Sequence, residues 1–189
     1  MTEEQRLILK LIAGMLDYPG HPEFWHRMEE RENLAQELND TLRNVFRAFH
    51  GTTPLELEKL YVKSFDFDEA GCLYMTFYEL ADSRARGEAL ISLVELYQKA
   101  GYEVPENQLP DFLPLLLEFV ALEPLHADQA LLQRIARAAA GIARHLEPSH
   151  LYYPLLGLIA DTLGYKEIQP SSAPSETPDD IDLPYPIDY

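Results

Sequence analysis

Two arginines near the middle of the chain are the first residues whose types and spacing suggest a binding role. Arg84 and Arg86 would both occupy the first turn of a helix, where the helix dipole disfavours cations. They therefore need acidic partners, and Asp82 and Glu88 lie close by in the sequence. The cluster is either a structural set of salt bridges or a polar clamp beside a binding groove.

A second candidate stretch, residues 106–114, combines carboxylates, prolines and an aromatic ring. Its candidate peptide-binding residues are Glu106, Leu109, Pro110, Asp111 and Phe112. Rigid prolines with two carboxylates and exposed aromatic rings suit a loop that binds a basic amphipathic helix. A plain junction between a loop and a helix has a similar composition, so composition alone does not decide between the two.

A third candidate group is aromatic. Tyr74, Phe77 and Tyr78 follow Phe65 within a densely apolar stretch. Such rings serve equally well as core packing or as the wall of an apolar groove. We include all three with the arginines as candidate binding residues.

Motifs for metal binding or catalysis do not emerge from the sequence. The six histidines form no pair four residues apart, so they are expected at the surface and not as zinc ligands. Residues 66–71 begin like a calcium loop, but Ala70 and Phe77 stand where oxygen ligands belong. Cys72 has apolar neighbours, which predicts a raised thiol pKa and an unreactive side chain. We expect no catalysis, no metal and no cofactor; a small helical enzyme or metal-dependent hydrolase is the alternative.

Composition limits the class of protein and of partner. The chain has 189 residues with 47% hydrophobic content, which suits one domain with a proper core. A net charge of −17 disfavours nucleic acid and anionic membrane surfaces as partners. A single cysteine suits a reducing cytosol, and no apolar run reaches the ~20 residues of a membrane span. The first four residues are acidic, unlike a signal peptide, so we predict a cytoplasmic protein without stable membrane association.

The elements that must position these residues are helices. Apolar residues recur at helical spacing almost throughout, which predicts an all-α, single-domain helical bundle. The stripes cover residues 7–15, 34–49, 55–65, 90–97, 116–120, 131–146 and 155–163, and we read residues 34–49 as one continuous stripe. Residues 69–82 are too densely apolar to assign a face, and both a short helix and an irregular segment fit.

Several helix ends are also marked. Thr53 followed by Pro54 and Glu56 is a capping box with proline at the first helical position. Gly101 is well placed to end the helix that begins near residue 83. Pro114 either lies in a kinked first turn or marks the true start of its helix. The small residues 138–141 would let a neighbouring element approach closely.

The last part of the chain differs in composition from the rest. Residues 165–189 contain five prolines and six acids against one lysine, which predicts a disordered acidic tail after a helical domain over residues 1–164. Within this tail, residues 181–189 mix acids with large apolar groups, as short docking motifs do. Plain disorder and docking both remain open.

Several linked motifs together resemble one family. The matching segments are residues 61–67 (Tyr-Val-Lys-Ser-Phe-Asp-Phe), 73–77 (Leu-Tyr-Met-Thr-Phe), 82–87 (Asp-Ser-Arg-Ala-Arg-Gly) and 109–119, which begins Leu-Pro-Asp-Phe-Leu-Pro. Residues 16–19 (Leu-Asp-Tyr-Pro) also resemble the opening of that family's sequences. In order and spacing they look like the NarJ family of nitrate reductase molybdenum-cofactor assembly chaperones, often called the delta subunit and related to the TorD and DmsD chaperones. The likeness covers roughly residues 5–164.

The resemblance implies an all-helical chaperone with a defined partner. It implies binding of the N-terminus of the catalytic (alpha) subunit of a respiratory nitrate reductase, which is kept competent for cofactor insertion before membrane docking. It places the peptide groove around the Leu-Pro-Asp loop at residues 109–111 and the neighbouring helices. The TorD branch commonly has histidine after the aspartate, where this chain has Phe112. The alternatives are a TorD- or DmsD-like chaperone for another molybdoenzyme and a structural helical subunit of a redox complex.

Overall fold

The structure, a computed structural model, describes residues 1–67 and 69–165 and is all-α, as the sequence predicts. Its helices are α1 (Glu3–Met15), α2 (Phe24–Leu38), α3 (Asp40–His50), α4 (Pro54–Phe65), η1 (a 3-10 helix, Glu69–Gly71), α5 (Met75–Leu80), α6 (Arg84–Lys99), α7 (Leu113–Leu122), α8 (Gln129–Ala143) and α9 (Tyr153–Thr162). In place of a sheet, the described residues contain one isolated antiparallel bridge, between Tyr74 and Phe112.

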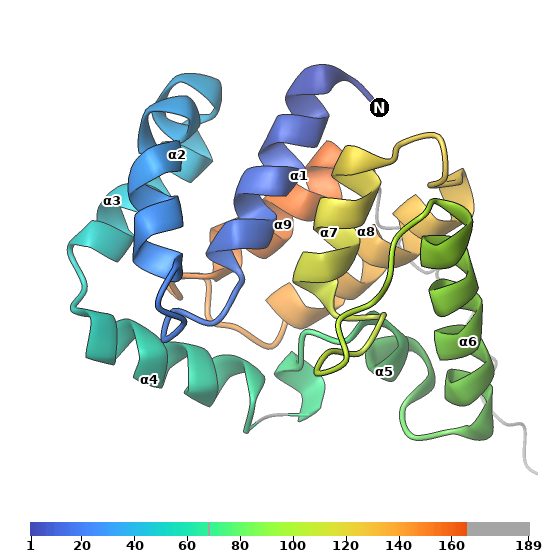
Figure 1. The fold of residues 1–189 in the computed structure, drawn as a ribbon. Coiled ribbons are helices and arrows are strands. Elements are labelled where there is room, and N and C mark those ends of the chain that lie inside the picture. Colours follow the sequence, from blue (N-terminus) through green and yellow to red (C-terminus); the bar gives the residue numbers. More distant parts are fainter. Residues whose placement is uncertain (68, 166–189) are drawn as a thin grey trace, which may run out of the picture.

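The helices surround a centre formed by α1, α7, α8 and α9 (Figure 1). Helix α1 packs along α7 and crosses α9, while α8 packs on α9 from the other side. Helices α2 and α3 form a pair on one flank, and α6 lies on the opposite flank beside α5. Helix α4 runs below them and leads through η1 to α5. In this arrangement of the helices, the long connection between α6 and α7 lies between α4 and α6.

An aromatic cluster fills the core where α3, α4 and the start of α9 meet. Tyr152 is fully buried, and its ring lies 5.5 Å from that of Phe49, 6.0 Å from that of Tyr61 and 5.1 Å from that of Phe65. Ring pairs at this spacing and edge-on orientation add to the free energy of burying the rings. The cluster fixes one wall of the region in which the candidate site lies.

One expectation about the helices is wrong. Residues 34–49 do not form one continuous helix, because Asn39 adopts an extended conformation between α2 and α3. Its side chain accepts hydrogen bonds from the backbone N–H groups of Thr41 and Leu42, so it caps a new helix. Leu34, assigned to the buried stripe, is 40% exposed. The local capping signal overrides the continuity of the apolar pattern.

The marked helix ends are confirmed. The Thr53 capping box forms with Glu56, and Pro54 opens α4. Pro114 lies in the first turn of α7 and marks its true start. Gly101 has φ of +83°, the left-handed conformation that ends a helix and favours glycine. The ambiguous stretch 69–82 contains the short helix α5, preceded by η1.

The small residues of α8 allow close contact with α5, as expected. A Cβ atom added to Gly141 would lie 2.1 Å from Cζ of Tyr78, so only glycine leaves room for this ring. Beside this contact, Glu79 of α5 forms a bidentate ion pair with Arg134 of α8. Helix α5 is thereby fixed against α8 both by packing and by charge.

The predicted tail, apart from Tyr165, lies outside the described residues, as does the docking motif at residues 181–189. In the part that the structure covers, every helix is too short or too polar to cross a bilayer. The division into residues 1–164 and 165–189 stays a prediction.

Candidate peptide-binding groove

The connection between α6 and α7 is held rigidly at its second half. The N–H of Met75 donates a hydrogen bond to the carbonyl of Asp111 at 3.0 Å, and the N–H of Leu113 donates to the carbonyl of Leu73 at 2.7 Å. The buried hydroxyl of Tyr97 donates to the carbonyl of Pro110 at 3.2 Å. Residues 110–113 are therefore tied to the start of α5 and to α6 through their backbone.

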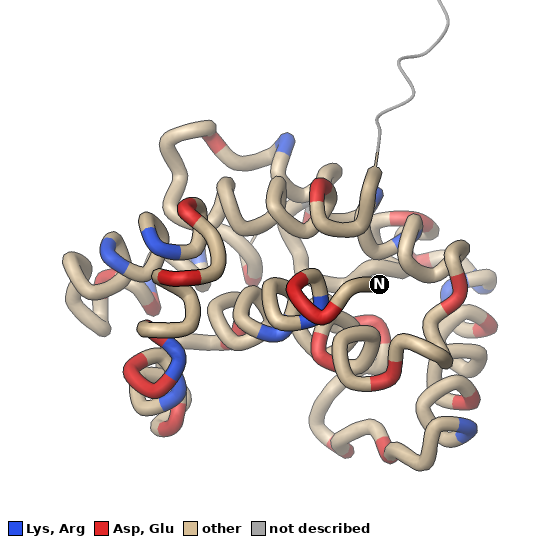
Figure 2. The backbone as a smooth tube through the Cα atoms, turned by 90° about the horizontal axis from the view of Figure 1, so that it is seen from above, with Lys and Arg blue, Asp and Glu red and all other residues tan. Residues whose placement is uncertain are grey.

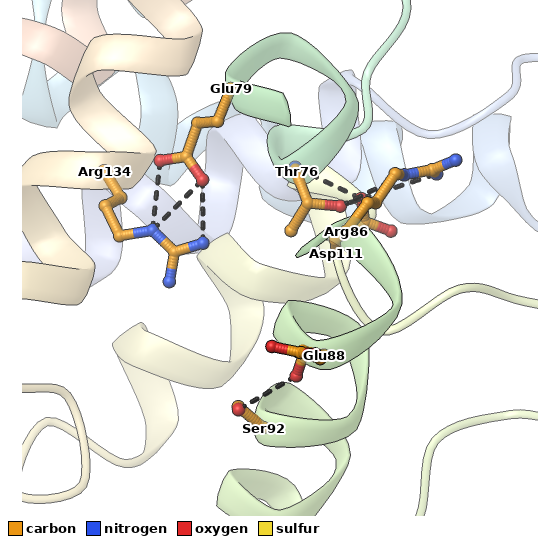
Figure 3. A network of polar contacts seen from close by, with 7 residues as sticks. All are labelled: Thr76, Glu79, Arg86, Glu88, Ser92, Asp111 and Arg134. Carbon is orange, nitrogen blue, oxygen red and sulfur yellow. Dashed lines mark hydrogen bonds and ion pairs between the residues drawn. The ribbon is translucent and has the colours of Figure 1, made fainter. Parts of the chain in front are cut away.

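The Asp111 side chain completes this attachment (Figure 3). It is fully buried and accepts hydrogen bonds from the N–H of Thr76 at 3.2 Å and from its hydroxyl at 2.5 Å. Nη2 of Arg86 lies 3.8 Å from the same carboxylate oxygen, and the Arg86 guanidinium also lies 5.3 Å from the ring centre of Phe77. We call Thr76, Arg86 and Asp111 the buried cluster.

The buried cluster corrects two expectations about charge. Arg86 pairs with Asp111, and not with Asp82 or Glu88, because the fold brings the start of α6 against the loop. Asp111 is 0% exposed and so does not meet a bound peptide directly in this conformation. Its carboxylate instead positions the loop.

An open groove lies on the other side of this loop. Its first part, with a volume of about 310 Å³, runs between the end of α1, α4 and the loop, and we call it the aromatic half. It is lined mainly by aromatic and apolar side chains: Tyr18, Tyr61, Val62, Phe65, Leu73, Tyr74 and Phe112, with Asp17, His21, Asp66 and Gln108. The rings of Tyr74 and Phe112 lie 5.5 Å apart across the loop contact.

The second part, of about 260 Å³, lies between α1, α2 and the start of α7. Its lining includes three cations, and we call it the basic half: Lys10, Arg27 and Arg31, with Ala13, Gly14, Asp17, Pro105, Asn107, Gln108, Phe112, Pro114, Leu115 and Glu118. Asp17, Gln108 and Phe112 line both halves, so the two halves are adjacent, and we call them together the groove.

The sequence-predicted site residues divide into three groups. Tyr74 and Phe112 line the aromatic half. Phe77 and Arg86, with Tyr74, line a neighbouring pocket of about 250 Å³ beside Cys72 and the exposed Phe67. The remaining predicted residues line none of these three spaces, as the described side chains define them: Tyr78, Arg84, Glu106, Leu109, Pro110 and Asp111. Among these, Tyr78 packs on α8, whereas Arg84, Glu106 and Leu109 are exposed to solvent.

Several groove residues were not predicted from the residues alone. Asp17 receives a 2.5 Å bond from Arg27 and a 3.3 Å contact from His21, and Tyr18 packs 5.5 Å from the ring of Tyr61. The available signal was the segment at residues 16–19, which carries part of the family resemblance. Gln108 lies in the candidate stretch 106–114 but was not named as a binding residue, although its side-chain oxygen accepts a 3.4 Å bond from the hydroxyl of Tyr74.

Burial shapes the protonation of the groove. It raises the pKa of the Tyr61 and Tyr74 hydroxyls, which therefore stay neutral at physiological pH. It also raises the pKa of Asp66. In the neighbouring pocket, burial raises the pKa of the Cys72 thiol, which confirms that prediction. The aromatic half thus carries neutral hydroxyl groups beside the carboxyl groups of Asp17 and Asp66.

Acidic residues are spread over most of the helices (Figure 2). Among residues 1–67 and 69–165, no three histidine, cysteine, aspartate or glutamate side chains lie close enough together to hold a metal ion. The groove differs from the rest of the acidic protein by its aromatic and cationic lining.

Comparison with known families gives the decisive observation. The family described as "Nitrate reductase delta subunit" matches residues 28–148 of the chain. The chain belongs to this family. The matched range contains the buried cluster and most of the groove, while α1 and the residues 16–19 segment precede it.

Named relatives of the family extend the match. The chain is 27% identical over 157 residues to the "Probable nitrate reductase molybdenum cofactor assembly chaperone NarJ" of Bacillus subtilis (strain 168), covering 80% of this chain and 85% of that relative. It is 29% identical over 154 residues to the "Nitrate reductase molybdenum cofactor assembly chaperone NarJ" of Escherichia coli (strain K12), covering 78% of this chain and 65% of that relative. These relatives are named as assembly chaperones, in agreement with the prediction that the chain is not an enzyme.

A solved structure shares the fold. It is described as a putative redox enzyme maturation protein from Archaeoglobus fulgidus, with a TM-score of 0.61 at 21% identity. The alignment covers 84% of this chain and 93% of the other. The helical arrangement is therefore common to both proteins.

Proposed function

We propose that this protein is a cytoplasmic assembly chaperone that binds the N-terminal segment of the catalytic (alpha) subunit of a respiratory nitrate reductase. Binding keeps that subunit competent for molybdenum cofactor insertion before it docks at the membrane. Membership of the delta-subunit family, with relatives named as NarJ chaperones, is the observation that carries the proposal. The groove gives it a physical location.

The aromatic half is the part of the groove that suits a leader segment. An amphipathic helix would place apolar side chains against Tyr18, Tyr74 and Phe112, the helix-in-groove mode of recognition. Its basic residues would meet Asp66, which lines this half, and Glu58, which accepts a 3.5 Å bond from the Tyr18 hydroxyl. In this arrangement the two acids would contact the basic residues of the leader, a role that the sequence predicted for Asp111.

Charge would act mainly on the rate of encounter. The net charge of −17 attracts a basic segment and speeds association more than it strengthens the final complex. A flexible leader also loses conformational entropy when it becomes ordered on binding. We therefore expect moderate affinity, which suits a chaperone because it must dissociate from the finished enzyme.

Calorimetric titration of the full chain with a synthetic leader peptide of its nitrate reductase tests the proposal. We expect micromolar binding, and we expect Tyr74→Ala to weaken it by about 10- to 100-fold, because removing a central aromatic contact costs about 1.4–3 kcal/mol. Leu125→Ala is the matched control, since Leu125 is 97% exposed and lies outside the groove.

Two results would contradict the proposal in different ways. No binding of any such leader at micromolar concentrations would remove the chaperone role. If Tyr74→Ala and Leu125→Ala weakened leader binding equally, the protein would still bind the leader, but at a site other than the aromatic half. A structural subunit would in addition copurify with the mature enzyme in fixed ratio, whereas a chaperone would be absent from it.

A further inference from the structure

The basic half of the groove contains cations that lack partners among the described residues. Lys10 and Arg31 are half-buried, yet neither forms an ion pair or a side-chain hydrogen bond with residues 1–67 or 69–165. Nη2 of Arg27 pairs with Asp17, but its Nε is buried without a hydrogen-bond partner. Half-buried cations without partners favour an anionic occupant.

This surface differs from the other cationic sites of the protein. Arg43, Arg86 and Arg134 each pair with a carboxylate of the fold itself. The unpartnered cations are instead placed beside an aromatic surface, because the two halves share Phe112 and Gln108. A ligand that fills the whole groove would therefore combine large apolar groups with carboxylates. A basic leader satisfies only the aromatic half.

One segment of this chain has that composition. Residues 181–189 contain two aspartates, Asp182 and Asp188, among two tyrosines, two isoleucines and a leucine. We propose that this segment docks in the groove of its own chain, with its aspartates at Lys10 and Arg31 and its apolar side chains on the aromatic half. It would then occupy the leader surface intramolecularly.

The last described residues contact α1, the helix that carries Lys10. Nε2 of Gln5 on α1 donates a 2.9 Å hydrogen bond to the carbonyl of Thr162, near the end of the described residues. Lys10 lies ~8 Å further along α1, at the helical rise of 1.5 Å per residue. The 15 residues 166–180 can span up to ~50 Å when extended, so the segment reaches the groove with slack.

Tethering makes even a weak contact significant. A connection of 15 residues sets an effective concentration on the order of 1 mM. A segment that binds with an intrinsic Kd near ~1 mM would then occupy its groove about half of the time. A leader peptide would compete with it, and its apparent affinity would fall about twofold.

Zero-length carbodiimide cross-linking of the dilute full-length protein tests the docking, because it joins a lysine to a carboxylate only at contact. Peptide mass spectrometry should find Lys10 joined to Asp182 or Asp188 at least five times more often than the exposed Lys59 or Lys99. Arg31→Glu should reduce the Lys10 link at least fivefold. Arg137→Glu, the same charge change at an exposed position of α8, should leave it unchanged.

The opposite results would overturn the proposal. Equal linkage of the segment to Lys10, Lys59 and Lys99 would show a tail without a preferred site. Equal effects of Arg31→Glu and Arg137→Glu would show attraction by net charge alone. Circular dichroism spectra of both variants should match that of the starting protein. If either variant fails this check, Arg31→Gln is compared with Arg137→Gln, and the Lys10 cross-link is interpreted in the same way.

The effect on leader binding rests on the proposed function and is measured separately. A variant with Asp182→Asn and Asp188→Asn should bind the leader peptide up to about twofold more tightly, whereas Asp179→Asn with Asp180→Asn should not. If no leader binds to any variant, the proposed function fails while the cross-links still decide the docking. Tighter binding in both variants would contradict docking at residues 181–189.

Discussion

Helix α5 is held by two ionic contacts that differ in their surroundings. On the loop side, Asp111 is fully buried and meets Thr76 and Arg86. On the α8 side, Glu79 and Arg134 form a bidentate pair whose side chains are 14% and 35% exposed. Water reaches both partners of the second contact, whereas at the first it reaches Arg86, which is 18% exposed, but not Asp111. The loop that borders the groove is therefore fixed by the contact that tolerates change least.

A third polar contact joins α4 to the turn before α9 and carries no ion pair. The Ser64 hydroxyl donates to the carbonyl of Leu60 at 2.6 Å and so accepts the bond from Nε2 of His150 at 2.9 Å. Nδ1 of His150 accepts from the N–H of Tyr152 at 3.2 Å. This arrangement requires a neutral imidazole. The three contacts thus range from a buried charge to a neutral hydrogen-bonded pair.

The largest effect is expected at the buried cluster. Asp111→Ala should lower the free energy of unfolding by about 3–5 kcal/mol, because it leaves the Arg86 guanidinium without its buried counter-charge. Asp111→Asn should cost less, since an amide oxygen can still accept from Thr76. Urea denaturation measures both. A loss for Asp111→Ala no greater than that for Glu79→Ala would refute the contrast between the two sides of α5.

The packing on the α8 side should come next. Gly141→Ala should cost about 1–3 kcal/mol, because the new methyl group would overlap the ring of Tyr78. Gly157→Ala is the control within α9, where nothing lies within 4 Å of the added atom, and it should stabilise by about 0.5–1 kcal/mol. Thermal unfolding compares them. Loss of stability in both would show that the ring of Tyr78 is not the cause.

The half-buried ion pair between Glu79 and Arg134 should contribute less. Glu79→Gln is expected to cost about 1 kcal/mol or less, because the pair is partly solvated. The difference from the starting protein should shrink as salt is raised from 0.05 to 1 M, about the range over which screening becomes strong. Urea denaturation at both salt concentrations is the measurement. A difference that is insensitive to salt would indicate a packing effect in place of charge.

The smallest effect is expected at His150. Burial, followed by the charge of Lys63, lowers its pKa from the ordinary value of 6.5, so the unfolded chain takes up this proton more readily. Stability from this group is complete above pH 6.5 and is lost as pH falls toward the lowered pKa. Denaturation at pH 7.5 and pH 5.5 should show a larger drop for the starting protein than for His150→Gln. An equal drop would assign the pH dependence to other groups.

The helices themselves follow from local rules that the sequence contains. The Thr53 capping box, Pro114 at a helix start and Gly101 at a helix end act over a few residues, so reading them requires no knowledge of the fold. The wrong prediction at Asn39 also concerns a local rule. The capping side chain of Asn39 was a local signal for a new helix, but the longer apolar stripe favoured one continuous helix.

The candidate site could be predicted only in part. Tyr74 was a candidate because clustered aromatic rings suit a groove wall, and Phe112 because it lies in the stretch 106–114. Asp111 was predicted to bind the peptide, and nothing in the sequence shows that Thr76 and Arg86 enclose it. Gln108 lies in the same stretch, but its type and spacing did not mark it as a binding residue.

By itself, the sequence determined the all-α class, most helix ends and, through linked motifs, the family, because capping and apolar periodicity act between near neighbours. Only the tertiary structure decided that Arg86 pairs with Asp111 and that Lys10 and Arg31 share a groove with Tyr74. These relations join residues from α1, α2, α5, α6 and the loop before α7. Their geometry depends on how helices pack, a long-range property that no single segment encodes.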